Sequence, residues 1–177
     1  NISIAQKWLI DQGEQPSQPW MSARTGFNGD FRGNSHVIYD LYVNRESNAA
    51  LFGSARRAVI ENLSLQNVVI HGEYNVGLVV GSSVETTLVN VHAQGQIKSG
   101  PHIVGGLAGE MLAGRIERSS ADVQIITLPK SSFGAGGARG VGGLVGVMNG
   151  TIRESYALGT IQDSDNDIQT IFGGLVG

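Results

Sequence analysis

The stretch VGGLVG at residues 141–146 has three glycines in six residues, a density that suits neither a helix interior nor an ordinary strand. Similar stretches recur along the chain: LFG at 51–53, VGLVVG at 76–81, VGGLAG at 104–109 and FGGLVG at 172–177. The spacing of their last glycines is nearly regular, with its longest step between Gly109 and Gly146. Self-similarity at such a spacing is typical of solenoid proteins, so the phrase is a structural repeat.

A second phrase follows each of the first four glycine phrases. Its copies are AVIENLSLQNVV at 58–69, TTLVNVHAQGQI at 86–97, AGRIERSSADVQI at 113–125 and GTIRESYALGTI at 150–161. Apolar and polar residues alternate in these copies, which indicates strands with one buried face. The first aliphatic positions, which again show their longest step before the last copy, are Ile60, Leu88, Ile116 and Ile152. The spacing of the two independent markers thus lengthens at the same place along the chain. Like residues are therefore expected to stack from coil to coil.

These patterns predict an all-β chain, a right-handed parallel β-helix (solenoid) with coils of about 22–37 residues. The shortest coil comes from HVIYDLYV at 36–43, if Ile38 occupies the same column as Ile60. We expect one domain over residues 1–177, with an opening coil at 1–43 and repeats at 44–177. Because the sequence lacks a starting Met and a signal-like segment, we expect it to be part of a longer protein.

The glycines of the repeated phrase are expected at corners of the coils. At a corner the backbone needs either a positive φ or close approach to the next coil, and glycine permits both. The predicted structural corner glycines are Gly53, Gly81, Gly105, Gly109, Gly142, Gly146, Gly173 and Gly177. The aliphatic residue inside each phrase should then point inward; these residues are Leu51, Val79, Leu107, Leu144 and Leu175.

Composition excludes several function classes. The net charge is −3 and only 15% of the residues are charged, so the concentrated basic surface that binds nucleic acid is missing. No apolar run reaches the ~18 residues that span a bilayer, so membrane insertion is not expected. The absence of cysteine rules out disulfides and thiolate metal sites.

One acidic cluster is a candidate metal site. The segment DSDND places Asp163, Asp165 and Asp167 at alternate positions, and calcium prefers such oxygen ligands. The EF-hand pattern is excluded because Ile168 stands where its glycine belongs, so the alternatives are a looser calcium site and a solvated acidic turn. The four histidines, which share no repeat column, are His36, His71, His92 and His102. For His36 we expect a structural hydrogen bond. Apart from the possible calcium ion, no cofactor is expected.

No catalytic residue is predicted. Carbohydrate-active enzymes also use parallel β-helices, but they need paired carboxylates or an equivalent set on one face. The outward column two residues after the anchor is predicted to contain Asp40, Asn62, Asn90, Arg118 and Glu154. Its two carboxylates would be three coils, more than about 10 Å, apart, and Asn62 over Asn90 is expected to form an amide ladder. No GxSxG elbow is present, and a Ser/His/Asp triad is left to the geometry.

The glycine phrases, each followed by a segment such as GTIRESYALGTI, resemble the GLUG-type repeats of large secreted bacterial proteins. Such repeats occur in haemagglutinin-like adhesins and in the N-terminal regions of IgA-cleaving metallopeptidases. FNGDFRGNSHVIYDLYV at 27–43 resembles the segment at the head of these solenoids. Two departures are Leu78, which stands where glycine is expected, and an insertion of about nine residues within 127–140.

The resemblance implies a non-catalytic structural or binding module of a secreted or cell-surface bacterial protein. Its role would be adhesion to host or matrix glycans or proteins, or that of a stalk, with an extracellular location. The partners it implies are a host or matrix glycan or protein and flanking repeats of the same chain, and an open solenoid end adds end-to-end self-association. The alternatives are a carbohydrate-active β-helix enzyme and the non-catalytic region of a secreted peptidase.

Overall fold

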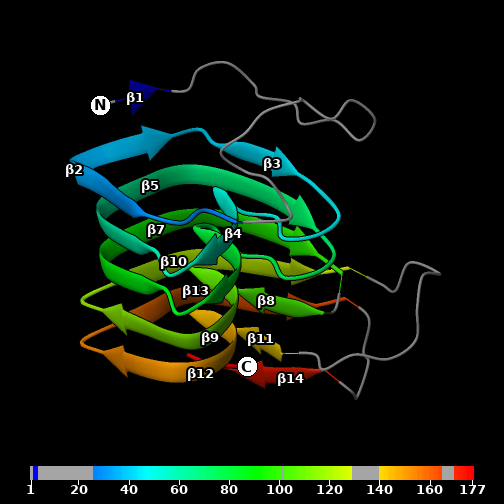
Figure 1. Ribbon diagram of the computed structural model, residues 1–177. Helices are drawn as coiled ribbons and strands as arrows, with labels where there is room; N and C mark the ends of the chain where they lie inside the picture. The colour runs from blue at the N-terminus through cyan, green and yellow to red at the C-terminus, as the bar shows by residue number, and fades with distance from the viewer. Residues whose placement is uncertain (1, 4–25, 101, 129–139, 165–169) are drawn as a thin grey trace.

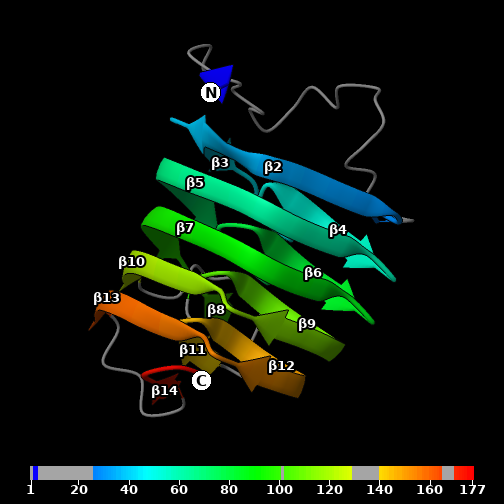
Figure 2. The same cartoon turned by 90° about the vertical axis from the view of Figure 1, so that its left-hand side faces the viewer.

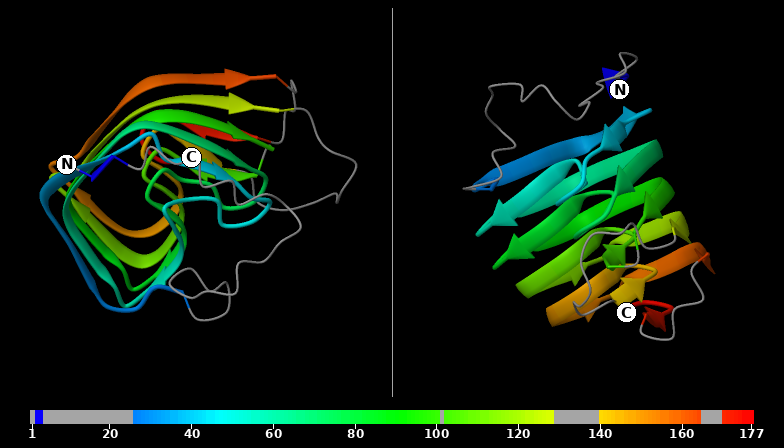
Figure 3. Two further views of the ribbon diagram at one scale, coloured as in Figure 1. Left: turned by 90° about the horizontal axis from the view of Figure 1, so that it is seen from above. Right: turned by 90° about the vertical axis from the view of Figure 1, so that its right-hand side faces the viewer.

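The computed structural model describes residues 2–3, 26–100, 102–128, 140–164 and 170–177. Within these residues the chain forms strands, turns and loops, and every strand pair is parallel. Successive coils stack along one axis (Figure 1). Viewed from the N-terminal end, the chain turns clockwise as it recedes (Figure 3), so the coil is right-handed. The predicted all-β parallel solenoid is confirmed.

Each coil consists of a long strand region followed by shorter ones. Eleven of the described strands join one sheet that bends around the coil corners (Figure 2). One side of it contains β2 (Asp30–Tyr39), β5 (Val59–Gly72), β7 (Thr87–Ser99), β10 (Ser120–Thr127) and β13 (Tyr156–Asp163). The next side contains β4 (Phe52–Arg56), β6 (Val80–Val84), β9 (Ala108–Glu117) and β12 (Val145–Arg153). The two short strands β1 (Ile2–Ser3) and β3 (Tyr42–Asn44) pair with β2 and β5. A second sheet contains β8 (Ile103–Gly105), β11 (Gly140–Gly142) and β14 (Ile171–Gly173).

The column of aliphatic anchors is present as predicted. Ile60 pairs with Leu88, which pairs with Ile116, and Ile116 pairs with Ile152. The first three of these side chains are completely buried. Burial of one such side chain contributes about 1.5–3 kcal/mol, so this column and its neighbours are the main source of stability along the axis.

The aliphatic residues inside the glycine phrases also point inward. Leu51 is 5% exposed, and Val79, Leu107 and Leu144 are completely buried. Leu175, in the last coil, is 36% exposed because no coil covers it within the described residues. Leu78, the departure from the glycine pattern, is completely buried as well.

The phrase glycines lie where the backbone of one segment runs close to another. Gly142 pairs with Gly105 on one side and with Gly173 on the other. A Cβ added to Gly81 would lie 2.6 Å from both the Asn48 Cα and the Gly53 carbonyl oxygen, closer than real Cβ atoms approach backbone. None of the eight predicted corner glycines has a positive φ. Of the two reasons expected for glycine at these positions, the structure shows the close approach.

Positive φ angles occur at asparagine more often than at any other residue type, and not at the phrase glycines. The φ angles lie between 52° and 55° at Asn48, Asn62, Asn67, Asn75 and Asn90. Asparagine tolerates this left-handed conformation better than most residues, and the chain changes direction there. The asparagine corners also carry the predicted ladder, because the Asn90 Nδ2 donates a hydrogen bond to Asn62 Oδ1 at 2.8 Å.

The register predicted for the opening coil is wrong. Phe31, not Ile38, pairs with Ile60, and Ile38 pairs with Leu65, so the opening coil is longer than predicted. The reason is an irregularity between Arg32 and His36, where the chain passes through positive φ angles and the pairing shifts. Periodicity alone does not show such extra residues.

The register departs from even spacing at two other places. Asp40 lies opposite Asn67, whose Nδ2 donates to its Oδ1 at 2.5 Å, and therefore not in the column of Asn62. Between Leu65 and Val68 the pairing of β5 with β7 shifts by one residue, so Ile70 pairs with Ile97. A bulge of this kind adds a residue to one strand without changing the alternation on either side.

We predict that Gly142→Val destabilises the protein by about 3 kcal/mol through overpacking. A Cβ at this position would collide with the Val145 carbonyl oxygen and lie 2.7 Å from the Gly177 nitrogen. Gly174→Val is the matched control, because no atom lies within 4 Å of a Cβ there. Urea unfolding of both variants measures the difference. Equal free energies of unfolding for the two variants would contradict the close-packing explanation.

Candidate functional site

The outward side chains of β2, β5, β7, β10 and β13 form the polar face. Because the strands are stacked in register, equivalent side chains align in rows along the solenoid axis. One row contains Ser64, His92, Ser120 and Tyr156. The next rows contain Gln94, Asp122 and Leu158, and then Gln96, Gln124 and Thr160. The polar face therefore presents hydrogen-bonding groups at the coil-to-coil repeat, about 4.8 Å.

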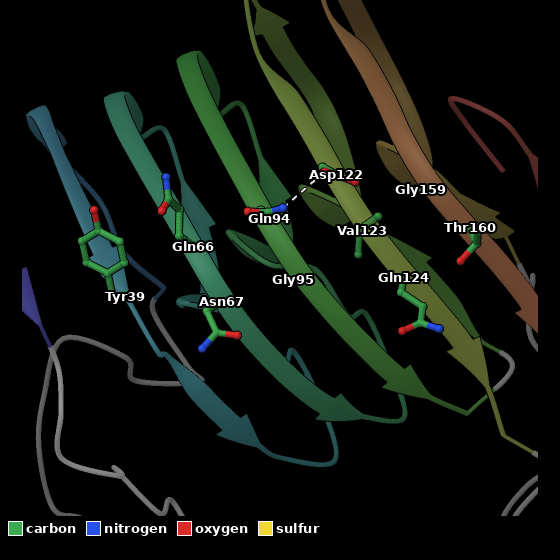
Figure 4. Close-up of a pocket in the computed structure, with 10 residues that line it drawn as sticks. All are labelled: Tyr39, Gln66, Asn67, Gln94, Gly95, Asp122, Val123, Gln124, Gly159 and Thr160. Atoms are coloured by element: carbon green, nitrogen blue, oxygen red, sulfur yellow. Dashed lines mark hydrogen bonds between the residues drawn. The ribbon is translucent and has the colours of Figure 1, made fainter.

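A shallow groove of about 460 Å³ runs across these rows (Figure 4). Gly95 and Gly159 are among its lining residues, and both lie in register with the buried Val123. Gly159 has a φ of 112°, a conformation that only glycine adopts without strain. The residues that line the groove are Tyr39, Gln66, Asn67, Gln94, Gly95, Asp122, Val123, Gln124, Gly159 and Thr160.

Hydrogen bonds between coils hold the polar side chains of the groove. Gln94 Nε2 donates to Asp122 Oδ2 at 3.3 Å, and Gln96 Nε2 donates to Gln124 Oε1 at 2.6 Å. Each amide still has unused donors and acceptors, because a primary amide offers two N–H groups and two lone pairs. The groove is thus a partly fixed set of neutral donors and acceptors around one carboxylate, a chemistry that suits hydroxyl groups.

Beside the groove, a chain of hydrogen bonds joins a serine, a histidine and an asparagine. His92 Nδ1 lies 2.8 Å from Ser120 Oγ, and His92 Nε2 lies 3.1 Å from Asn90 Oδ1. Asn90 Oδ1 can only accept, so Nε2 carries the proton and Nδ1 accepts from the serine hydroxyl. The order matches a nucleophilic triad, but Asn90 is neutral and Ser120 is only 9% exposed. These hydrogen bonds are therefore interpreted as a structural link between coils.

A second polar cluster surrounds Glu117 at the corner between β9 and β10. The carboxylate, whose side chain is 10% exposed, forms ion pairs with Arg115 and, at 3.5 Å, with Arg118. The hydrogen bond from Arg115 is the main cause that holds the pKa of Glu117 below its ordinary value. The positive charges of Arg115, Arg118 and Arg153 act in the same direction, whereas burial of the carboxylate acts in the opposite direction.

The sequence-predicted metal site is only partly within the described residues. Asp163 is described, and its Oδ1 accepts a hydrogen bond from Thr127 Oγ1 at 2.6 Å. Asp165 and Asp167 lie outside the described residues. In the described ranges, no group of three or more His, Asp or Glu side chains could hold a metal ion.

The histidines lie in separate places. His36 Nδ1 lies 3.0 Å from the Gly33 carbonyl oxygen, which confirms the predicted structural hydrogen bond. His71 contacts the edge of Tyr42, and burial, followed by the charge of Lys98, lowers its pKa. His102 packs against Tyr74 with ring centroids 4.2 Å apart.

The groove was not predicted from the sequence, although a signal for it was present. Gln94 and Asp122 have the same spacing along the chain as Gln96 and Gln124, so equal spacing of amides and carboxylates marks the rows. Gly95 and Gly159 also line the groove, and their register with Val123 follows that of Ala93, Ala121 and Ala157.

Comparison with known proteins relates the chain to repeat-containing proteins. The family model of the GLUG motif matches residues 137–162. The chain contains a GLUG motif. Its 153 matched residues, 84% of the chain, are 31% identical to an immunoglobulin A1 protease of Streptococcus pneumoniae (strain ATCC BAA-255 / R6) and cover 7% of that protein. The corresponding protease of Streptococcus sanguinis is 29% identical over 84% of the chain and 8% of the protease.

A third relative carries a different name. Halomucin of Haloquadratum walsbyi is 35% identical over 112 residues, which are 62% of the chain and 1% of halomucin. The chain thus spans less than a tenth of the length of each of these curated relatives. A crystal structure of a proposed immunoglobulin A1 protease from Bacteroides ovatus aligns over 94% of this chain and 74% of its own, with 15% identity and a TM-score of 0.38.

The GLUG match covers one copy of each of the two repeated phrases. The matched residues 137–162 contain VGGLVG and the following GTIRESYALGTI, which form the corner and the strands β12 and β13. The described part of the chain contains no helix with the length and apolarity needed to cross a membrane.

We predict that Glu117→Gln lowers stability at pH 7 and that the difference from the parent shrinks in acid. The pKa of Glu117 is lowered on folding, so its stabilisation is present above the ordinary value of 4.5 and is lost as pH falls through the folded-state pKa. Urea unfolding at pH 7 and pH 3.5 measures this.

Glu85→Gln serves as the control for this pH dependence. Glu85 pairs one-to-one with Arg57 at 2.8 Å, and both side chains are more than half exposed. Exposed pairs contribute little to stability, so this variant should change the free energy of unfolding only slightly. A pH-independent loss in Glu117→Gln would contradict the role of the charge.

Proposed function

We propose that the chain is a non-catalytic binding and structural module of a secreted or cell-surface protein, and that the polar face binds a glycan. The observation that carries the proposal is the groove of about 460 Å³ with its rows of cross-linked amides. Sugars present many hydroxyl groups, each a donor and an acceptor, and such rows offer matching partners at a regular spacing. Tyr39 lies at one end of the groove, where its ring can contact the apolar face of a sugar (Figure 4).

The carboxylates argue against hydrolysis in the groove. Among the residues that line it, Asp122 is the one carboxylate, and its Oδ2 accepts a hydrogen bond from Gln94. Glycoside hydrolysis ordinarily needs two carboxyl groups, about 5–9.5 Å apart. The alternative of a carbohydrate-active enzyme would be established by product release from a polysaccharide that Asp122→Asn abolishes.

The comparisons support a module that acts in different parent proteins. Related regions occur in immunoglobulin A1 proteases and in halomucin, where they make up at most 8% of the whole. A short region shared by proteins of different names supports a role separate from proteolysis. The parent would thus be an extracellular protein, either an adhesin or a peptidase in which this region is non-catalytic.

The repeat architecture supports adhesion or a stalk role. Stacked coils give a stiff extended body, and each coil offers the same kind of face to the ligand. Several weak contacts along one polymer then add up to strong overall binding. The proposed partner is a host or matrix glycan, with a glycosylated host protein as its natural carrier.

We predict that immobilised polysaccharides retain the protein and that Gln94→Ala weakens the binding about tenfold, the loss of one well-placed hydrogen-bonding group. Asn149→Ala is the matched control, because Asn149 is an exposed amide on β12 outside the groove. Calorimetric titration with each retained polysaccharide gives the dissociation constants. Equal weakening by both variants, or no retention on any glycan, would reject the polar face as the binding surface.

Self-association through the C-terminal end face is also part of this proposal. The last coil exposes Ile171 by 65% and Phe172 by 42%, next to the part-exposed Leu175 and Val176. In inner coils, residues of the same columns, such as Val141, are completely buried beneath the next coil.

We therefore predict that the 177-residue chain self-associates at high concentration and that Ile171→Lys reduces the association, because the charge opposes apolar stacking. Leu128→Lys is the control, since Leu128 is 43% exposed but lies at the end of β10. Sedimentation velocity gives the size distributions. Monomeric behaviour of the parent chain, or equal effects of the two variants, would contradict the role of this end.

A further inference from the structure

The corner around Glu117 concentrates arginines that do not belong to the groove. Arg153 pairs in register with Glu117, and Arg115 and Arg118 flank Glu117 on the coil before. The Arg118 backbone nitrogen donates to the Arg153 carbonyl oxygen at 3.1 Å, which joins the two coils at this corner. None of the three arginines lines the groove, so the corner is a separate surface.

Positive charge exceeds negative charge at this corner. Three guanidinium groups stand beside two carboxylates, those of Glu117 and of Glu154, which follows Arg153. Glu117 is shared by Arg115 and Arg118. Among the described residues, Arg153 has no ion pair within 4.0 Å, although it lies close enough to act on the pKa of Glu117. The cluster is therefore not neutralised from within.

The geometry leaves the guanidinium groups accessible from outside. The Arg115 and Arg118 side chains are 53% and 55% exposed, whereas the Glu117 side chain beneath them is 10% exposed. A guanidinium group has five N–H donors, so one or two bonds to Glu117 leave others free. The carboxylate thus holds the two guanidinium groups in place from below, and their remaining donors are available to a ligand.

Other ion pairs of the chain differ from this arrangement. Arg57, at a different left-handed corner with a φ of 50°, pairs one-to-one with Glu85 at 2.8 Å. Arg32 has two carboxylates within 4.0 Å, those of Asp30 and Glu61. Among the described residues, only Glu117 forms ion pairs with two arginines and also lies in register with a third.

We infer that Arg115, Arg118 and Arg153 form a binding site for an oxyanion, a carboxylate or sulfate group on an acidic polysaccharide. The planar donor fork of arginine matches the oxygen spacing of both groups and forms paired, charge-assisted hydrogen bonds with them. Because the overall net charge is −3, binding depends on this local cluster and not on the general charge of the protein.

The test uses three polymers and compares Arg153→Gln with Arg57→Gln. Polygalacturonate supplies carboxylates, dextran sulfate supplies sulfates, and dextran is the neutral reference. We expect at least one charged polymer to bind, with a dissociation constant that rises about tenfold in Arg153→Gln and less than about twofold in Arg57→Gln. Arg153 has no ion pair to lose, so Arg153→Gln is expected to keep the thermal unfolding midpoint of the parent. An unchanged midpoint shows that this variant folds.

The outcomes separate this site from the groove. If neither charged polymer binds, or if Arg57→Gln weakens binding as much as Arg153→Gln, the oxyanion site is rejected. Arg118→Gln gives a second reading, and binding unchanged in both Arg118→Gln and Arg153→Gln also rejects it. Gln94→Ala is expected to leave the binding of the charged polymer within about twofold, so failure of the groove and failure of this site are distinguished.

Discussion

The direct stacking of each coil on the next is the constraint on which the rest of the structure depends. Ser120–Thr127 pairs residue for residue with His92–Ser99 on one side and with Tyr156–Asp163 on the other. Neighbouring parallel strands lie about 4.8 Å apart, so an inward side chain has only the space between the equivalent side chains of the coils above and below. Ala93, Ala121 and Ala157 therefore form one column, and larger aliphatic residues form others. The phrase glycines follow from the same constraint, because they lie where backbone meets backbone.

Stacking explains which parts of the fold could be predicted from the sequence. A column of like residues, such as Ile60, Leu88 and Ile116, is visible as an even spacing along the chain and was confirmed as a register. The opening coil was misregistered because positive φ angles at Asn34 and Ser35 insert residues that alternation does not reveal. The left-handed corners at asparagine were also missed. Sequence reasoning assigned backbone freedom to the phrase glycines, whereas these glycines provide space and the left-handed corners use other residues, asparagine most often.

The candidate surfaces were less predictable than the fold, since each depends on contacts between coils. The Asn62–Asn90 ladder could be predicted because both residues have the same neighbours in consecutive copies. The groove was not predicted, because its shape depends on side-chain conformations and cross-coil hydrogen bonds, such as that of Gln94 with Asp122, which spacing along the chain does not give. Glu117 and Arg153 directly follow the anchors Ile116 and Ile152, so the predicted columns place them side by side, whereas the ion pairs of Glu117 with Arg115 and Arg118 depend on side-chain conformation.

The same stacking separates the structural from the variable parts of each coil. Inward columns must repeat because their space is fixed, whereas outward columns face solvent and are free to differ. Ser64, His92, Ser120 and Tyr156 occupy equivalent outward positions with different chemistry, while the adjacent inward Leu65, Ala93 and Ala121 stay apolar. The phrase glycines expose no side chain and pack against backbone, so they offer little to a ligand. The proposed binding surfaces therefore lie on the outward rows, where a side chain can change without disturbing the stack.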